Sequence, residues 1–444
     1  MKGVKRNWLR AYFFTSIGLS AALAAFAYGV AVGTYKVFPY QFLEKAAAAA
    51  RDWAQYPRHY ARLRPDKFLA PTPHDARNFA GHNSEGAYGG VTFVDGFFND
   101  SLGMRLLDMD GTVMHEWRVS FNGIWPDAAH IDQTLHDWDT QIHGAILYPN
   151  GDVVFNFQYA GLVRIDKCSS TKWKLPYQTH HSVFQDVDGN LWVPSRRLRE
   201  EPIEYLPNLP LPFQEEFALK VSPDGEILSE ISILDAILQS KYEGVLFANG
   251  AHDSVLSVPL DGDFTHLNDI KILEAPAAEA FPLFAEGDIL VSLRNLNLLL
   301  VLDSETTAIK WSRTGPFLRQ HDPDFLPNGK ISVFDNRRDS VGGAAFGGSR
   351  ILQIDPVSGE NFVRYPRAGD EPFYTATMGD HQYFRNGNVL ITESKAGNAF
   401  EVTPSGEIVW SFVNKWDHES VALIGGAIRY PTPYARSIQA EECQ

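Results

Sequence analysis

The stretch HGAILYPNGDVVFNFQ (143–158) contains two short apolar runs that meet at an Asn-Gly turn. An Asn-Gly pair between apolar runs is a strong sequence signal for a β-hairpin. The pattern returns in HSVFQDVDGNLWVPSR (181–196), HDPDFLPNGKISVFDN (321–336) and, with a shorter first strand, HQYFRNGNVLITES (381–394). The sequence therefore predicts one type of hairpin that is repeated along the chain.

A second type of hairpin lies between these segments and recurs six times. In each copy an apolar strand ends at an acidic or polar turn, and the second strand often finishes on an aromatic residue. The copies are RLLDMDGTVMHEW (105–117), VRIDKCSSTKWKL (163–175), LKVSPDGEILSEI (219–231), LVLDSETTAIKW (300–311), LQIDPVSGENFVRY (352–365) and FEVTPSGEIVWSF (400–412). Two hairpins make a four-stranded sheet, and such a unit repeated every 40–60 residues or so is typical of a β-propeller. Six copies predict six blades.

Two strand-like segments remain outside these pairs of hairpins. They are GGVTFVDG (89–96) and, near the other end of the chain, SVALIGGAIRYP (420–431). We expect them to share one blade, so that the two ends of the propeller close the ring. The predicted fold class is therefore all-β, a six-bladed β-propeller over residues 86–444.

The N-terminal segment has the character of a membrane anchor. Four basic residues within positions 2–10 precede a run without charged residues, 11–35, which as a helix would be roughly 37 Å long. Because the basic flank comes first, the positive-inside rule places the propeller outside the cytoplasm. We expect a single-pass inner-membrane protein: residues 1–38 form a cytoplasmic tip and anchor, and residues 39–85 a helical stalk and linker. A cleaved signal peptide is the alternative.

Composition excludes several classes of protein. The chain has 444 residues, of which 44% are hydrophobic and 13% aromatic, so a disordered or fibrous protein is excluded. The net charge of −15 and the lack of a basic stripe argue against a nucleic-acid partner. Cys168 and Cys443 form neither a zinc spacing nor a disulfide framework, and a long-range bridge between them stays open.

The repeat also locates a site. In the first type of hairpin a histidine begins the first strand, and a polar residue stands seven positions after the turn glycine. The pairs are His143 with Gln158, His181 with Arg196, and His321 with Asn336. Inner strands of every blade line the central channel, so equivalent histidines converge on one mouth of it. The blade at 232–312 departs from the pattern, but Arg294 still follows its turn glycine by seven residues.

Three segments together resemble the bacterial arylsulfate sulfotransferase family. They are T-H-L-N-D-I (265–270), V-S-L-R (291–294), and R-Q-H-D-P (319–323) running to I-S-V-F-D-N (331–336). The closing G-G-A-I-R-Y also fits. The family consists of periplasmic six-bladed propellers that move sulfuryl groups between phenols without a nucleotide sulfate donor. The resemblance implies an aryl sulfate donor, a phenolic acceptor and no cofactor or metal.

The resemblance also implies roles for individual residues. His321 would be the nucleophile that becomes sulfohistidine, while His266, Asn268 and Arg294 would bind the sulfuryl group. One of the pair His180 and His181 would complete the cluster, and we favour His181 because it occupies the ring position. Further substrate contacts are expected from His180, His143, Arg196 and Asn336. A neighbouring His266 can protonate the leaving phenolate and later deprotonate the acceptor.

Two other functions remain open at this point. One is a non-catalytic membrane-anchored propeller that binds a ligand or protein partner, since a fold does not imply a function. The other is a metal-dependent propeller hydrolase, for which the candidate carboxylates Asp322, Asp380 and Asp269 occur next to the histidines. The sequence determines neither the natural substrates nor the oligomeric state.

Overall fold

The computed structural model describes residues 2–35, 37–72, 85–131, 135–204, 211–247, 262–439 and 443. The chain divides into two compact units, residues 1–67 and 68–444. The second unit thus begins before residue 86, where we expected the propeller to start. The reason is the strand β1 (Leu69–Pro71), which pairs with β25 (Ser420–Ala422) of the body. The expected linker is therefore shorter, and its residues 73–84 lie outside the described part.

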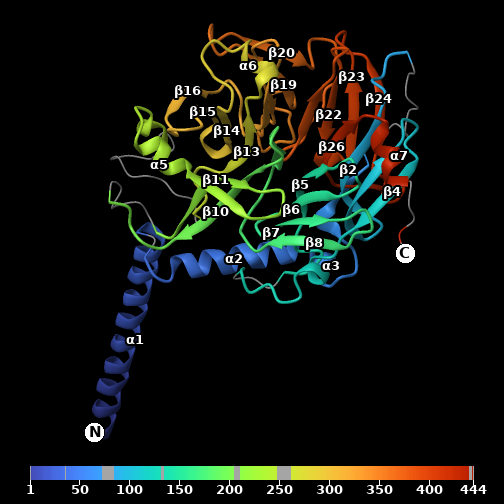
Figure 1. The fold of residues 1–444 in the computed structure, drawn as a ribbon. Coiled ribbons are helices and arrows are strands. Elements are labelled where there is room, and N and C mark those ends of the chain that lie inside the picture. Colours follow the sequence, from blue (N-terminus) through green and yellow to red (C-terminus); the bar gives the residue numbers. More distant parts are fainter. Residues whose placement is uncertain are drawn as a thin grey trace. The chain divides into compact units, whose positions relative to one another are not determined.

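The first unit is helical. It contains α1 (Lys2–Tyr35), α2 (Tyr40–Gln55) and α3 (Pro57–Tyr60), and η1 (Asp66–Phe68) spans its boundary with the second unit. By length and composition, residues 8–35 of α1 could cross a membrane, and no other helix among the described residues passes that test. In α2, which lies in the expected helical stalk, the side chains of Phe42 and Trp53 are exposed. Figure 1 shows these helices in blue.

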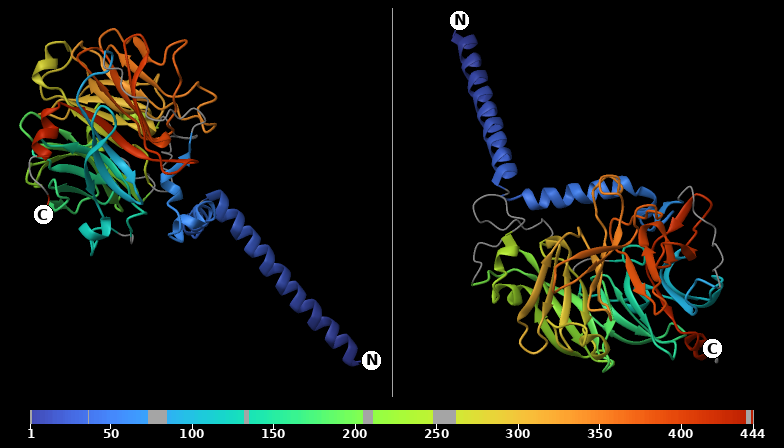
Figure 2. Two further views of the ribbon diagram at one scale, coloured as in Figure 1. Left: turned by 90° about the vertical axis from the view of Figure 1, so that its right-hand side faces the viewer. Right: turned by 90° about the horizontal axis from the view of Figure 1, so that it is seen from above.

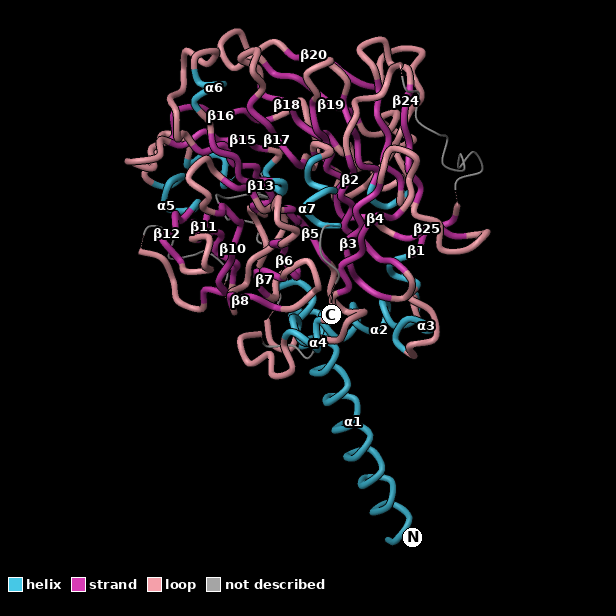
Figure 3. Tube along the Cα trace, turned by 45° about the vertical axis from the view of Figure 1, so that its right-hand side comes forward, coloured by secondary structure: helices cyan, strands magenta, loops and turns pink. Residues whose placement is uncertain are grey.

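The described part of the second unit contains six four-stranded antiparallel sheets, besides the two-stranded pair β1–β25. Figure 2 shows the sheets from two further sides, and Figure 3 shows how strongly strands dominate over helices in this unit. In every sheet the four strands follow the order expected for a propeller blade: the strand at one edge lies next to the channel, and the strand at the opposite edge lies at the rim. The predicted six-bladed propeller is confirmed.

The blades follow the chain. The first is β26 (Ile424–Tyr430), β2 (Val91–Phe98), β3 (Ser101–Leu107) and β4 (Val113–Arg118); the second is β5 (Ile142–Leu147), β6 (Val153–Phe157), β7 (Gly161–Ile165) and β8 (Thr171–Leu175); the third is β9 (Phe184–Gln185), β10 (Leu191–Arg199), β11 (Phe213–Val221) and β12 (Ile227–Ser232). The fourth is β13 (Leu267–Ile272), β14 (Ile289–Leu293), β15 (Leu298–Leu302) and β16 (Ile309–Thr314); the fifth is β17 (His321–Phe325), β18 (Ile331–Asp335), β19 (Arg350–Ile354) and β20 (Asn361–Tyr365); the sixth is β21 (Asp380–Tyr383), β22 (Val389–Glu393), β23 (Asn398–Val402) and β24 (Ile408–Val413).

Short helices connect or decorate the blades. They are α4 (Phe121–Ile124), α5 (Ile233–Leu238), η2 (Glu243–Phe247), α6 (Ala275–Ala278), η3 (Arg294–Leu296), η4 (Ser394–Ala396) and α7 (Pro433–Gln439). The helix α6 falls in the blade at 232–312, where the sequence departs from the repeat pattern. The helices η3 and η4 occupy the same position in the fourth and sixth blades, directly after the second strand of each. Arg294 opens η3 and thereby leaves the sheet at the channel end of β14.

Two features close the ring. The strand β26 pairs with β2, Val91 opposite Tyr430 and Phe93 opposite Ile428, so the two leftover segments share one blade as predicted. A disulfide between Cys168 and Cys443 joins the β7–β8 turn to the C-terminal tail, across 275 residues of sequence. The sequence left this bridge open, and the structure contains it. Apolar side chains such as Trp117 and Phe155 fill the interior between blades.

Candidate functional site

Irregular backbone at the start of the inner strands positions the site's imidazoles. The strand pairing shifts register between Ile142 and Ala145, between Leu267 and Asp269, and between His321 and Asp324. Such β-bulges re-aim side chains and are common beside active sites. Each shift lies next to a histidine that we expected in the ring.

Positive φ angles accompany these bulges. His181 and His266 adopt φ values of 55° and 56°, which are uncommon for residues other than glycine. Gly144, with φ +83°, approaches the carbonyl oxygen of His181 so closely that a Cβ there would lie 2.2 Å from it. Any side chain at position 144 would push the strands of His143 and His181 apart.

Four histidines from four blades lie together. The ring centroid of His181 is 4.3 Å from that of His143, 4.8 Å from that of His266 and 6.3 Å from that of His321. The predicted convergence of these side chains on the channel is therefore observed. His181 is the central member of the cluster. His381, from the hairpin with the shorter first strand, lies elsewhere: its Nε2 contacts the Ser332 hydroxyl at 2.8 Å.

Asn336 determines which nitrogen of His321 carries the proton. The Asn336 amide nitrogen donates to the carbonyl oxygens of Thr375 and Met378, at 2.9 and 2.7 Å. The Asn336 side-chain oxygen is therefore an acceptor, and it lies 2.6 Å from His321 Nδ1, which must carry the hydrogen. The lone pair of the neutral ring is then on Nε2. That atom is buried and has no hydrogen-bond partner among the described residues.

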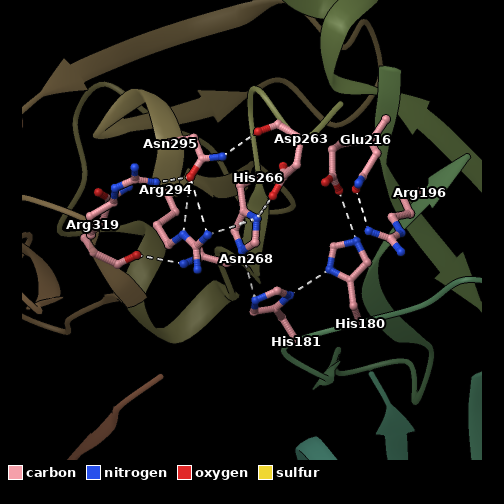
Figure 4. A network of polar contacts seen from close by, with 12 residues as sticks. His180, His181, Arg196, Glu216, Asp263, His266, Asn268, Arg294, Asn295 and Arg319 are labelled. Atoms are coloured by element: carbon pink, nitrogen blue, oxygen red, sulfur yellow. Dashed lines mark hydrogen bonds and ion pairs between the residues drawn. The ribbon is translucent and has the colours of Figure 1, made fainter. Parts of the chain in front are cut away.

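His266 is held between a carboxylate and a guanidinium (Figure 4). Its Nδ1 contacts the Asp263 carboxylate, and a terminal nitrogen of Arg294 lies 3.3 Å from the same Nδ1. The Arg294 backbone amide donates to the His266 carbonyl oxygen at 3.0 Å, which ties η3 to this strand. Arg319 contacts the Asn295 side-chain oxygen, so a second guanidinium lies beside Arg294.

His180 and His181 extend the cluster to the third blade. The two Nδ1 atoms are 2.8 Å apart, and the Nε2 atoms of His181 and His266 are 3.2 Å apart. On the other side, His180 Nε2 lies 3.0 Å from a carboxyl oxygen of Glu216 on β11. Tyr159 covers His180, with ring centroids 4.9 Å apart. Figure 4 shows the row from Glu216 to Asp263.

Burial keeps these imidazoles neutral. It lowers the pKa of His180, His181 and His321 well below 6.5, and nearby positive charge acts in the same direction. The pKa of His143 falls to about 3 for the same two reasons. Burial also lowers the pKa of His266, although the Asp263 carboxylate opposes this. The site therefore presents neutral ring nitrogens at physiological pH.

Two residues that were predicted to contact substrate form hydrogen bonds within the protein instead. The Asn268 amide nitrogen donates to the Gln320 carbonyl oxygen at 2.7 Å, directly before His321 in the chain. The Arg196 guanidinium contacts the side-chain oxygens of Gln178 and Gln214 and lies 3.5 Å from the Tyr159 ring centroid. Both thus support neighbouring elements of the site.

A cavity of about 100 Å³ lies beside the cluster and is lined by residues from all six blades. His143 and His321 contribute to its wall, together with several carboxylates. Asp322, Asp324 and His381 are near enough to one another to hold a metal ion. However, the Lys271 ammonium lies 2.9 Å from Asp322 and 3.0 Å from Asp324, and so already supplies a cation to both carboxylates.

Sequence reasoning missed three charged residues and one amide of the site. Asp263 stands three residues before His266, and Arg319 stands two residues before His321, but neither position follows from the repeat. Glu216 left a signal: FQEEFALKV (213–221) places two adjacent carboxylates in an otherwise apolar strand. Gln320 is fully buried and binds the Ser292 hydroxyl at 3.0 Å.

Comparison with solved structures finds matches at low sequence identity. A protein of unknown function from Bacteroides caccae is 13% identical, with 73% of this chain and 94% of that chain covered and a TM-score of 0.47. Virginiamycin B lyase from Staphylococcus aureus is also 13% identical, with 61% and 69% covered and a TM-score of 0.32. A search of curated proteins found no match.

The family comparison is decisive. The pattern of the arylsulfotransferase (ASST) family matches residues 144–415, which is more than half of the chain. The matched range includes His181, His266, Arg294 and His321. Together with the propeller, it supports the resemblance that the sequence suggested. The chain belongs to the arylsulfotransferase family.

Proposed function

We propose that the protein transfers a sulfuryl group from an aryl sulfate to a phenol, with His321 as the nucleophile. The observation that carries this proposal is the Nε2 atom of His321. It is buried, holds the lone pair of a neutral ring because of Asn336, and has no partner among the described residues. A nucleophile needs such an atom, whereas a structural histidine has its ring nitrogens satisfied.

The reaction has two half-reactions in this proposal. First, an N–S bond forms between His321 Nε2 and the sulfuryl sulfur while the bond from sulfur to the aryl oxygen breaks, and the phenolate that leaves takes a proton from the site. Then the oxygen of a second phenol attacks the sulfur and its proton returns to the site. The N–S bond breaks, and its electron pair goes back to Nε2.

The surroundings of His321 suit a sulfuryl group. By analogy with phosphoryl transfer, charge spreads over three oxygens in the transition state, so fixed cationic donors do most of the work. Arg294 offers a planar fork that matches two adjacent oxygens, and Arg319 adds charge behind it. Asn268 acts by holding the backbone before His321 through its bond to Gln320. Neutral imidazoles at His181 and His266 can give and take the proton.

The setting in the cell is part of the proposal. The apolar stretch in α1 would anchor the chain in the inner membrane, and the basic residues before it favour a periplasmic propeller. The disulfide Cys168–Cys443 supports this orientation because such bonds persist in oxidising compartments.

The test is incubation of the purified protein with a chromogenic aryl sulfate, with and without a phenol acceptor. We expect turnover that depends on the acceptor, and formation of the acceptor's sulfate ester. Release to water at the same rate without acceptor indicates a sulfatase, and activity that chelator abolishes indicates the metal-dependent hydrolase. No release at all favours a binding protein.

A further inference from the structure

With His266 neutral and Asp263 ionised, the row of groups in Figure 4 permits one consistent placement of protons. At one end, contact with His266 and nearby guanidinium groups lower the pKa of Asp263 despite its burial, so Asp263 is an ionised acceptor. His266 Nδ1 therefore carries a hydrogen, and its Nε2 carries the lone pair. His181 Nε2, 3.2 Å away, must donate to that lone pair. His181 Nδ1 is then an acceptor.

The same assignment of hydrogens and lone pairs continues through His180 to Glu216 at the other end of the row. The 2.8 Å contact between the two Nδ1 atoms requires His180 Nδ1 to donate to His181. His180 Nε2 is left with a lone pair, and the atom facing it at 3.0 Å is a Glu216 carboxyl oxygen. Neither of these two atoms has a hydrogen-bond partner elsewhere in the described residues. An ionised Glu216 would place a negative charge against a lone pair, so the geometry requires a protonated carboxyl.

The environment of Glu216 agrees with that requirement. Its side chain is 2% exposed. Burial, followed by the negative charge of Asp263, raises the pKa of Glu216 well above 4.5, and this outweighs the opposing effect of Arg196 and Arg294. The burial of His180 lowers the pKa of that ring, with Arg196 acting in the same direction. The proton thus belongs to Glu216.

We infer that Glu216 stores the proton that the leaving phenolate takes in the first half-reaction, and that His180 and His181 carry it. This inference rests on the proposed function. Glu216 gives its proton to His180 Nε2, His180 Nδ1 gives its own to His181 Nδ1, and His181 Nε2–H protonates the phenolate oxygen. The products are the phenol, an ionised Glu216 and two imidazoles that have exchanged tautomers. The acceptor phenol drives the same transfers in reverse.

Such a row spares the site a buried charged ring. His180, His181 and His266 remain neutral before and after the transfer, and a buried imidazolium in this row would be costly. His181, rather than the expected His266, then delivers the proton to the substrate. Glu216 touches no substrate atom and acts through the two histidines.

The test uses the substitution Glu216→Gln with Glu215→Gln as its matched control. The Gln amide can donate to His180 Nε2 and keep the tautomers, but it cannot release a proton. Glu215 is the neighbouring carboxylate on β11, where it contacts Arg199 at 2.7 Å and Ser232 at 2.9 Å. The single-turnover rate of phenol release is measured for a series of aryl sulfates whose phenols differ in acidity.

We expect the effect of Glu216→Gln to grow as the leaving phenol becomes less acidic. The rate for the most acidic phenol falls no more than about threefold, whereas the rate for the least acidic falls about a hundredfold or more, the size of a lost proton transfer. Glu215→Gln keeps the wild-type slope. A uniform decrease across the series, with unchanged slope, would overturn the inference because it would indicate a structural role.

A measurement on the wild-type protein covers the case in which Glu216→Gln does not fold. Infrared difference spectra are recorded on addition of aryl sulfate without acceptor. Loss of one protonated carboxyl band on sulfation is expected, and sulfation without that loss contradicts the storage role. A wild-type protein that gives no single-turnover release at all contradicts the proposed function itself.

Discussion

His321 and Asp322 are neighbours on β17, yet they belong to two networks of opposite character. His321 Nε2 has no hydrogen-bond partner among the described residues. Asp322 is fully engaged: its carboxylate lies 2.9 Å from Lys271 Nζ, accepts from the His381 backbone amide at 2.7 Å, and lies 2.8 Å from His381 Nδ1. His321 therefore keeps a reactive atom free, whereas its neighbour Asp322 is paired on every side.

This difference separates chemistry from structure within a single ring of polar residues. Polar residues converge on the channel from every blade, so convergence alone does not identify the reactive ones. What identifies the reactive residues is whether each buried polar atom has a hydrogen-bond or ion-pair partner. A buried imidazole nitrogen without a partner costs stability, and the proposed nucleophile His321 Nε2 is such an atom. Lys271 on the fourth blade, by contrast, pairs with Asp322 and Asp324 on the fifth, and these three residues form the Lys271 cluster. Substitutions in the two networks should accordingly separate loss of activity from loss of stability.

The largest effect is expected from His321→Asn. The variant should lose sulfuryl transfer by at least about a thousandfold, because no neighbouring group replaces the nucleophile. Its thermal unfolding should stay close to that of the wild type. Initial rates with an aryl sulfate and a phenol, together with a melting curve, check both statements.

His381→Gln is the control from the network of Asp322. It removes a buried imidazole that contacts Asp322 and Ser332. We expect a lower melting temperature with transfer activity retained in the folded protein. If His381→Gln abolishes transfer as His321→Asn does, the two networks are not distinct.

Arg294→Lys should come next, with a loss of activity of about 10²–10³-fold. The ammonium cannot make the two parallel bonds of the guanidinium to adjacent sulfuryl oxygens. Arg196→Lys is the matched comparison, because Arg196 binds Gln178 and Gln214 instead. Less than about a tenfold loss is expected there, since only a supporting contact is removed. Equal losses in kcat/KM for the two variants would refute the assignment.

Lys271→Met tests the network of Asp322 through stability. The substitution leaves Asp322 and Asp324 without their cation, and breaking such a buried pair costs about 3–5 kcal/mol in the free energy of unfolding. Lys172→Met is the control, because Lys172 is an exposed side chain that pairs with Asp152. This ion pair should contribute about 1 kcal/mol or less to the free energy of unfolding. Urea unfolding measures the free energy of unfolding of both variants. Similar losses of stability would show that Lys271 stabilises the fold no more than an exposed ion pair does.

The smallest effect is expected from pH. Because burial and Arg294 hold the pKa of His321 well below 6.5, its ring stays neutral as the pH falls from about 7 to about 6. The single-turnover rate of sulfation should therefore stay nearly constant over that interval. A rate that halves near pH 6.5 would mean that His321 titrates like a free histidine and is not buried in the way described.

The repeat allowed much of the fold to be predicted. Hairpin spacing predicted six blades and the shared closing blade, because turn residues and apolar alternation are local signals. The same spacing brought His143, His181 and His321 together. The strand at residues 69–71 was not predicted, since three residues with no periodic pattern pair only through a distant partner, β25.

The proton network could not be predicted in the same way. Glu216 faces a histidine of another segment, His180, which only the folded chain brings to it. Asp263 reaches His266, three residues further on, through an irregular backbone in which His266 has a positive φ, and that conformation depends on packing. The hydrogen bonds of Arg196 to Gln178 and Gln214 likewise depend on the tertiary structure and have no signal in the sequence. The disulfide joins residues 275 positions apart, and two cysteines alone do not show that they meet.

The central claim is that His321 carries the sulfuryl group between donor and acceptor. The most direct measurement is mass spectrometry of the peptide containing His321 after brief exposure to an aryl sulfate without acceptor, under conditions that preserve N–S bonds. The account predicts that this peptide gains the mass of one SO₃ on His321, and that adding a phenol removes it. Acceptor-dependent transfer without that modification, or with modification of another residue, would contradict it.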